Sequence, residues 1–441
     1  MLSLDSTPTQ GAHKDRARTD RLVLPLKDIV KVFHLNHSDI NGGAARAAYR
    51  IHHALRAAGI DSRMCVNVAA AGDWTVQGPA RKWDKLSARL RPQLVRPVRA
   101  TFRTGNRIIH SPALLPSHWV KQINASDTDL VHLHWIAGEM LSIADIGRIN
   151  KPIVWTLHDM WAFCGAEHYT DDQRWREGYR ADNRPAHESG FDLNRWTWQR
   201  KRKHWRRPMQ IAAPSRWLAD CARESALMRD WPVSVIHNAL DTERWSPLPR
   251  DLARELLGLP PQVPLLLFGA MGGGRDPRKG FDLLTGALEH LRDEPRLQGL
   301  ELLVFGQCAP QTPPALGFPI HYSGHLHDDL SLRALYSAAD AMAIPSRQDN
   351  LPNTGVEAHA CATPVIAFDT GGLPDIVAHQ QTGYLAKPFD TQDLARGIAW
   401  VLSEAGACQL SAQARQRAVA RFDAAAVASA YRQLYAEVLA D

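Results

Sequence analysis

The chain has 441 residues, of which 45 % are hydrophobic and 22 % are charged, and its formal net charge is +6. Because one compact core rarely exceeds roughly 250–300 residues, this length predicts two domains. The composition excludes a collagen, a coiled coil and a wholly disordered chain. No apolar run approaches the ~20 residues that cross a bilayer, so we expect no membrane-spanning segment.

Residues 1–28 are polar and mixed in charge, without the apolar core of a secretory signal peptide. We therefore expect a disordered N-terminal tail and a cytoplasmic protein. The six cysteines lie far apart and include no CxxC pair, which predicts reduced thiols instead of a disulfide framework or a structural zinc site.

Two basic stretches carry aromatic or leucine residues between their cations. Residues 81–107 hold nine Lys or Arg against one acid, and residues 195–207 repeat the pattern with tryptophans. Such segments suit an anionic membrane surface, where cations meet headgroups and aromatic rings lie at the interface. RNA binding and a solvated helix face are the alternatives.

The first half of the chain alternates strands and helices. The apolar runs at 29–35, 130–135 and 152–159 are predicted strands, and a helix follows the first of them up to Gly59. The segments 211–225 and 233–241 complete this first α/β unit. Continuous apolar strands are typical of a parallel sheet covered on both faces. We place this α/β domain at 29–250, and residues 161–206, which break the rhythm, are predicted to be an insertion.

A proline-rich stretch at 245–262 predicts a domain boundary. The pattern then restarts over 251–415, with predicted strands at 264–271, 300–307, 319–324, 341–346 and 363–369. The tail from Ser411 to Leu439 reads as one long helix.

Ligands of open parallel sheets bind beyond the carboxyl ends of the strands. Gly42 and Gly43 follow the first strand and open a helix, where backbone N–H groups can approach a phosphate. In the second half, glycines lead to Arg275, Arg278 and Lys279 just before a helix. These cations and the helix dipole favour a diphosphate, although neither a Walker A loop nor GxGxxG is present.

Asp349 and Glu357 are separated by seven residues. A loop carrying Asp349, Asn350 and Leu351 precedes a helix carrying Glu357. This arrangement places one carboxylate near a sugar and the other near a ribose, where it can accept hydrogen bonds from the two ribose hydroxyls.

This region resembles the E-x7-E region of glycosyltransferase family 4, retaining enzymes of the GT-B fold that use nucleotide-activated sugars. The likeness extends to GGA at 42–44, DLVHLHW, WTLHD, PSRWLADCARES, VIHNALDTERWSP, RKGFDLL, LYSAADAMAIPS, EAHACATPVIAFDTGGLPDIV and GYLAKPFD. It is closest to members that build bacterial exopolysaccharide or O-antigen on a lipid carrier. Two departures are Asp349, where the family has Glu, and Cys164, which alone remains of several cysteines.

The resemblance implies a GT-B protein of two Rossmann-like domains that face an interdomain cleft. Domain 29–250 would bind the acceptor, domain 251–415 the nucleotide sugar, and helix 416–441 would pack back on the first domain. The implied donor-binding residues are Gly42, Gly43, Arg275, Lys279, Asn350, Leu351 and Glu357. Arg275 and Lys279 would hold the diphosphate and Glu357 the ribose.

The implied catalytic residues are His158, Asp349 and Glu357, with His158 facing the transferred sugar from the first domain. The reaction implied is transfer of a hexose, with retention, from a nucleoside diphosphate sugar to a lipid-linked glycan acceptor in bacterial polysaccharide biosynthesis. Apart from this co-substrate no cofactor or metal is expected. The enzyme would associate peripherally with the inner face of the cell membrane.

Other assignments compete with this one. Asp127 and Asp129 form a DxD motif but precede a strand, and His132 with His134 could bind a metal but lacks a third ligand at a persuasive spacing. His158 and Asp159 could form a hydrolytic dyad, yet no GxSxG accompanies them. A nucleotide-sugar 2-epimerase, a phosphorylase and a non-catalytic module that binds polyanions or membranes are the alternative functions.

Overall fold

The computed structural model describes residues 30–269, 276–326, 328–403 and 407–440. The expected tail at 1–28 and the predicted phosphate ligand Arg275 lie outside these ranges. Within them, every helix is too short or too polar to pass through a bilayer.

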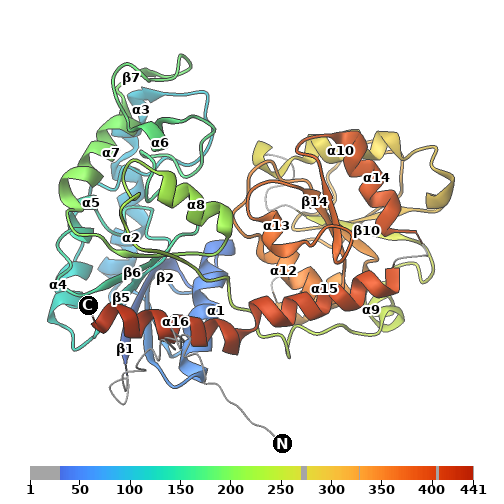
Figure 1. Cartoon of the computed structure of the whole chain (residues 1–441), viewed down its shortest axis with the longest axis horizontal. Coiled ribbons are helices and arrows are strands. Elements are labelled where there is room, and N and C mark those ends of the chain that lie inside the picture. Colours follow the sequence, from blue (N-terminus) through green and yellow to red (C-terminus); the bar gives the residue numbers. More distant parts are fainter. Residues whose placement is uncertain (1–29, 270–275, 327, 404–406, 441) are drawn as a thin grey trace, which may run out of the picture.

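The first domain contains a seven-stranded parallel sheet in the order β3-β2-β1-β5-β6-β8-β9 (Figure 1). Its strands are β1 (Lys31–Ser38), β2 (Asp61–Val68), β3 (Val76–Gln77), β5 (Leu130–Leu133), β6 (Ile153–Thr156), β8 (Gln210–Ala213) and β9 (Val233–Val235). Its helices are α1 (Gly43–Ala57), α2 (Lys82–Leu94), α3 (Arg96–Ala100), α4 (Trp119–Ala125), α5 (Ile143–Ile146), α6 (Arg174–Glu177), α7 (Leu193–His204) and α8 (Arg216–Glu224). The strand order reverses between β1 and β5, which marks a topological switch point.

The second domain repeats the plan with six parallel strands in the order β12-β11-β10-β13-β14-β15. The strands are β10 (Leu265–Gly269), β11 (Glu301–Phe305), β12 (Ile320–Tyr322), β13 (Ala341–Ile344), β14 (Val365–Phe368) and β15 (Gly383–Ala386). The helices are α9 (Arg250–Leu257), η1 (Pro277–Lys279), α10 (Phe281–His290), η2 (Pro295–Leu297), α11 (Asp329–Ala338), α12 (Asn353–Ala360), α13 (Leu373–Ile376) and α14 (Thr391–Val401). Here the switch point lies between β10 and β13. Both sheets and their helices give the GT-B fold that the resemblance implies.

Three strands of the two parallel sheets, as the structure describes them, have no counterpart among the predicted segments. They are β2, β3 and β15. β2 begins with Asp61, Ser62 and Arg63, so its polar start hides the buried Met64 and Cys65 that follow. β3 is only two residues long, and β15 begins at Gly383 and has two partly buried central residues, so it is not an uninterrupted apolar run.

The single helix expected over 411–439 is wrong. The structure has two helices, α15 (Ala407–Phe422) and α16 (Ala424–Ala440), separated by Asp423. Leu240 pairs with the backbone at this break, and the Asp423 carboxylate accepts hydrogen bonds from Ala425 N at 2.9 Å and Thr242 Oγ1 at 2.6 Å. An acceptor at this position caps the N-terminus of α16, so the chain turns there.

The two helices therefore serve different domains. Phe422 of α15 is buried in the core of the second domain, whereas Tyr431 and Tyr435 of α16 are buried in the core of the first. Figure 1 shows α16 lying under the first domain, with α15 under the second. The Tyr431 hydroxyl is 2.8 Å from Thr156 Oγ1 at the end of β6.

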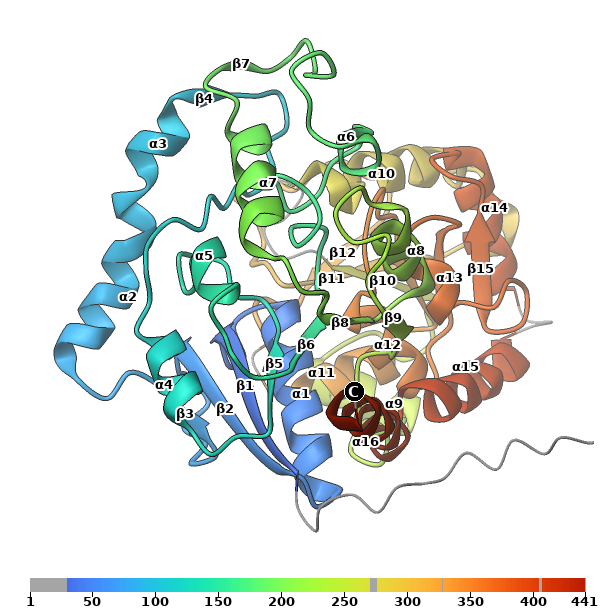
Figure 2. The same cartoon turned by 60° about the vertical axis from the view of Figure 1, so that its left-hand side comes forward.

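Residues 161–206 lie between β6 and β8 and cap the first domain (Figure 2). The segment also forms β7 (Ser189–Gly190), which pairs with β4 (Phe102–Arg103). Its tryptophans Trp198 and Trp205 are buried, and Lys201 Nζ donates to Cys164 O at 3.0 Å and Gly165 O at 2.7 Å. The prediction that the rings of 195–207 lie in a membrane interface is wrong for these two, because they form part of the core.

Candidate functional site: an interdomain cleft

The loops that follow the strands at the two switch points face each other across the domain boundary. Asn353 Nδ2 donates to Gly43 O at 2.9 Å, and Asn350 Nδ2 donates to Leu157 O at 3.3 Å. Ser215 Oγ donates to Asn350 Oδ1 at 2.7 Å. These bonds hold the loops after β1, β6 and β8 against those after β13, where ligands of open parallel sheets bind.

Lys279 and Asp349 form an ion pair at this domain boundary. Lys279 Nζ lies 2.6 Å from Asp349 Oδ2, which also accepts from Ser346 Oγ at 3.3 Å. The close approach depends on Gly280, whose φ is 65° and where a Cβ would lie 1.9 Å from Pro345 O. No other residue type fits there without moving the backbone. An ammonium group and a carboxylate are thus held together at the domain boundary.

Glu357 is placed on α12 and is only 3 % exposed. Its Oε2 accepts from the Tyr336 hydroxyl at 2.9 Å, and its Oε1 forms an ion pair with Arg50 Nη2 at 2.7 Å. The Arg50 guanidinium also lies over the Trp245 ring, 5.2 Å from its centroid. Burial and the nearby carboxylate raise the pKa of Tyr336 well above its usual value, so this hydroxyl remains a donor.

Arg50 belongs to α1 of the first domain, so the carboxylate expected to bind the ribose is engaged from across the cleft. No sequence motif points to Arg50. The helix α1 contains three arginines, Arg46, Arg50 and Arg56, and no local signal distinguishes Arg50 from the other two.

Asn350 and Leu351 are both buried. Asn350 bridges the domains through the bonds to Ser215 and Leu157, and Leu351 is packed in the core of the second domain. Gly42 and Gly43 instead line a pocket at the start of α1, together with His37 and Trp135. Gly42 has a φ of 97°, which favours glycine at this turn.

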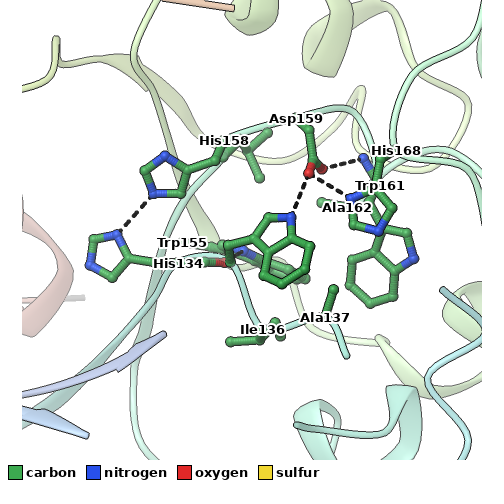
Figure 3. A pocket seen from close by; sticks show the side chains of 11 residues that line it. His134, Ile136, Ala137, Trp155, His158, Asp159, Trp161, Ala162 and His168 are labelled. Atoms are coloured by element: carbon green, nitrogen blue, oxygen red, sulfur yellow. Dashed lines mark hydrogen bonds and ion pairs between the residues drawn. The ribbon is translucent and has the colours of Figure 1, made fainter. Parts of the chain in front are cut away.

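His158 lines a second pocket, after β6, that also contains His134, Trp135 and His168 (Figure 3). Burial lowers the pKa of His158 to about 4, so the ring is neutral near pH 7. The adjacent Asp159 does not pair with it. Asp159 Oδ2 accepts from His168 Nδ1 at 2.6 Å and from Trp135 Nε1 at 2.8 Å, so the hydrolytic dyad considered above is not formed.

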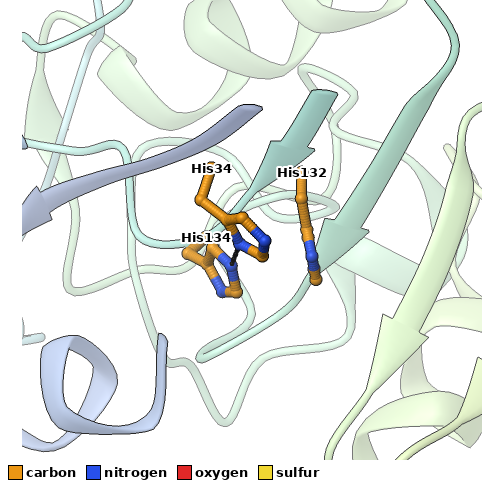
Figure 4. A group of neighbouring side chains, drawn as sticks. All are labelled: His34, His132 and His134. Atoms are coloured by element: carbon orange, nitrogen blue, oxygen red, sulfur yellow. Dashed lines mark hydrogen bonds between the residues drawn. The ribbon is translucent and has the colours of Figure 1, made fainter. Parts of the chain in front are cut away.

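A third histidine, His34 on β1, joins His132 and His134 in a buried group (Figure 4). Hydrogen bonds engage five of the six ring nitrogens, all but His34 Nε2. One nitrogen of each of the three rings lies within 4.8 Å of one on the other two, and the rings of His132 and His134 stack at 4.1 Å. Because hydrogen bonds already engage five of the six nitrogens, the structure describes the group as a hydrogen-bonded cluster.

The DxD motif lies at the opposite edge of the first sheet. Asp129 Oδ2 accepts from the backbone N of Lys31 at 2.9 Å, and Asp127 pairs with the Lys31 ammonium. Both carboxylates stand at the amino ends of β1 and β5, away from the cleft.

Two family models match this chain. The model described as Glycosyltransferase Family 4 matches residues 41–244, and the model described as Glycosyl transferases group 1 matches residues 265–404. D-inositol 3-phosphate glycosyltransferase 2 of Catenulispora acidiphila is 30 % identical over 228 residues, covering 47 % of this chain and 51 % of the relative. The chain spans about half the length of the curated relatives it matches.

Solved structures share the fold over nearly the whole chain. Sucrose-phosphate synthase from Thermosynechococcus elongatus has a TM-score of 0.62 at 19 % identity and covers 93 % of this chain and 99 % of its own. HepE from Anabaena, solved with UDP and glucose, has a TM-score of 0.60 at 17 % identity. The match covers 92 % of this chain and 100 % of the HepE chain. Residues 41–244 are thus similar to Glycosyltransferase Family 4 and residues 265–404 to Glycosyl transferases group 1, in a chain that has the GT-B fold.

Proposed function

We propose that this chain is a retaining glycosyltransferase that moves a hexose from a nucleoside diphosphate sugar to a lipid-linked glycan acceptor in bacterial polysaccharide biosynthesis. The observation that carries the proposal is that the candidate residues of the second domain lie at the boundary with the first: Lys279 pairs with Asp349 beside Asn350, which bonds Ser215 and Leu157, and Glu357 pairs with Arg50 of α1. A cation there stabilises the charge that develops on a departing diphosphate, which is the largest electrostatic contribution in such reactions.

The names of similar proteins support the class of donor. HepE was solved with UDP and glucose, and the Catenulispora relative is named for transfer to D-inositol 3-phosphate. We infer a nucleoside diphosphate hexose as donor for this chain. We also infer that Lys279 contacts the diphosphate, Glu357 the ribose, and His158 with Asp349 the transferred sugar.

The proposal is tested by incubating the protein with GDP-mannose, UDP-glucose or UDP-galactose and either a lipid-diphosphate glycan or D-inositol 3-phosphate. We expect a glycosylated lipid-linked product with the donor's anomeric configuration, formed equally well in EDTA. An epimerised sugar formed without acceptor would identify an epimerase instead. Calorimetry that finds no binding of any nucleoside diphosphate sugar would contradict every version of the proposal.

Replacing Glu357 by glutamine tests the ribose assignment. The change removes the charged acceptor, and hydrogen bonds to charged groups contribute about 1.5–3 kcal/mol. We expect the donor KM to rise roughly 10- to 150-fold with a smaller change in kcat. Glu289→Gln on the exposed side of α10 is the control. An unchanged donor KM in the Glu357 variant would remove this residue from the nucleotide site.

We also propose that residues 81–107 bring the enzyme to an anionic membrane. No residue of α2 is buried, and Trp83, Leu86, Leu90 and Leu94 are exposed at spacings that place them on one helical face. Trp83 is 78 % and Leu94 65 % exposed. Arg91 fixes the helix to the domain through bonds to Glu139 O at 2.7 Å and Leu115 O at 2.6 Å.

Figure 2 shows α2 on the outer edge of the first domain, away from the second. An apolar stripe flanked by Arg81, Lys82, Lys85 and Arg89 has the chemistry of an interfacial helix. Trp198 and Trp205 of the segment 195–207 are buried and therefore cannot serve as aromatic anchors in a membrane.

Vesicle binding checks this surface. The variant Trp83→Glu/Leu90→Glu is expected to bind vesicles of anionic phospholipid at least about tenfold more weakly than the unchanged protein, because it loses apolar anchors and gains repulsion. The matched control, Leu252→Glu/Leu256→Glu, likewise replaces two exposed apolar side chains by glutamate, here two leucines of α9. Equal loss in both variants, or no loss in the first, would contradict a specific role for α2.

A further inference from the structure

Three histidines form a hydrogen-bonded chain that leads to the pocket after β6. His34 lies on β1, His134 directly follows β5, and His158 lies two residues after the end of β6. His34 Nδ1 is 3.0 Å from His134 Nε2, and His134 Nδ1 is 3.2 Å from His158 Nε2. Figure 4 shows the first of these contacts and Figure 3 the second.

All three rings are neutral near pH 7. Burial and neighbouring histidines lower the pKa values of His34 and His134 well below their usual range, and burial lowers that of His158 to about 4. A neutral imidazole has one N–H donor and one acceptor nitrogen. Since both nitrogens of His134 face other histidines, this ring donates to one neighbour and accepts from the other. Only two polarities of the chain are possible.

The far end of the chain selects between them. His34 Nε2 is buried and has no hydrogen-bond partner within the described residues. If the chain ran from His158 towards His34, this nitrogen would be an orphaned N–H group, which is the rarer defect in proteins. If it runs from His34 towards His158, the nitrogen is an unprotonated acceptor.

We propose that His34 and His134 are positioning residues that fix His158 in the Nδ1–H tautomer, so that His158 has a hydrogen-bond donor to offer a ligand. His158 Nε2 is then the acceptor of the His134 N–H and cannot take a proton from a substrate. Nδ1 makes no hydrogen bond within the described residues, and the ring lines the pocket of the first domain that lies after β6. In this role His158 would bind a sugar oxygen and would not act as a general base.

The role of His158 towards a sugar rests on the proposed function, but its tautomer can be measured without turnover. Long-range ¹H–¹⁵N correlation on the full chain with ¹⁵N-labelled histidine reports which nitrogen carries the proton. Because the chain has 20 histidines, the signals are assigned by loss in His34→Leu, His134→Phe and His158→Gln. We expect protonated Nδ1 and bare Nε2 for all three. A protonated Nε2 on His158, or a doubly protonated ring at pH 7, would overturn the proposal.

The dependence of His158 on the chain is tested with a matched pair of variants. In His134→Phe, the two ring nitrogens of His158 should move towards a common averaged shift, and kcat should fall about tenfold or more with little change in donor KM. His52→Phe is the control. His52 is an equally buried neighbour, but it forms hydrogen bonds with Ser62 and Thr75 and with none of the three histidines of the hydrogen-bonded chain. It should leave the His158 signals unchanged.

An unaltered His158 tautomer in His134→Phe would overturn the proposal. If that variant does not fold, His34→Leu tests the same dependence from the end of the chain. Zinc added to the unchanged protein gives a further check: joint shifts of His34, His132 and His134 would identify a metal site and overturn the hydrogen-bonded chain. If the tautomers are as expected and no transferase activity is found, the proposed function is contradicted, whereas the hydrogen-bonded chain of histidines is supported.

Discussion

Replacing Lys279 by alanine is expected to lower kcat/KM for the nucleotide sugar by about 30- to 1,000-fold, equivalent to about 2–4 kcal/mol. The ammonium group stabilises charge on the leaving diphosphate, and it is held in position by Asp349 at 2.6 Å. The variant also leaves the Asp349 carboxylate without its partner. Steady-state kinetics with the donor varied at saturating acceptor measures the effect.

Lys387→Ala is the control for the Lys279 variant, because Lys387 is an exposed lysine of the same domain. It should keep kcat/KM within about twofold, as expected for a solvated charge far from the reaction. A Lys279 variant with kinetics as close to those of the unchanged protein would show that this cation does not contact the diphosphate.

Replacing Arg174 by methionine is expected to destabilise the first domain by about 3–5 kcal/mol. Arg174 and Glu188 are each 2 % exposed in their side chains and form an ion pair at 2.7 Å within the 161–206 segment. The Arg174 guanidinium also contacts Asp172 at 3.2 Å and lies over the Tyr179 ring. Removing one partner of a buried pair strands the other charge in a medium that solvates it poorly. Calorimetric unfolding measures the loss.

The same helix provides the comparison for Arg174. Arg176 pairs with Glu224 at 2.7 Å, but the two side chains are 43 % and 51 % exposed. Surface pairs contribute about 0–1 kcal/mol, so Arg176→Met should change stability little. The double variant Arg174→Met/Glu188→Leu should recover much of the loss, because it removes the stranded charge. Equal effects of Arg174→Met and Arg176→Met would contradict the burial argument.

The sequence predicts the parallel α/β architecture because most strands are short runs of uninterrupted apolar residues. β5 and β6 are buried at every position, and such strands stand out in any reading of the chain. β2 does not, since its charged start masks its buried middle. The break between α15 and α16 was also missed, because the partner that interrupts the helix is Leu240, far away in sequence.

The residues of the candidate site also fall into two groups, those that the sequence indicates and those that only the structure shows. Gly42, Lys279, Asp349 and Glu357 lie in motifs that already single them out in the sequence as candidates for ligand binding. Arg50 reaches Glu357 only because two domains meet, and no spacing along the chain encodes that meeting. Residues that act across an interface are visible only in the structure.

His34 was missed for a related reason. On β1 it reads as one polar residue within an apolar strand, and its partner His134 is 100 residues further along. The parallel register of β1 and β5, which places His34 beside His132, brings the three rings together.

The helix α16 follows the second domain in sequence but packs against the first, and this arrangement has a consequence for the synthesis of the protein itself. Val427, Tyr431 and Tyr435 complete the core of the first domain, and the Tyr435 hydroxyl bonds His132 Nδ1 at 2.7 Å. The ribosome adds these residues only after it has translated the entire second domain. The first domain to emerge is therefore the last to be finished, and a nascent chain arrested before Ala424 would expose an apolar groove to chaperones.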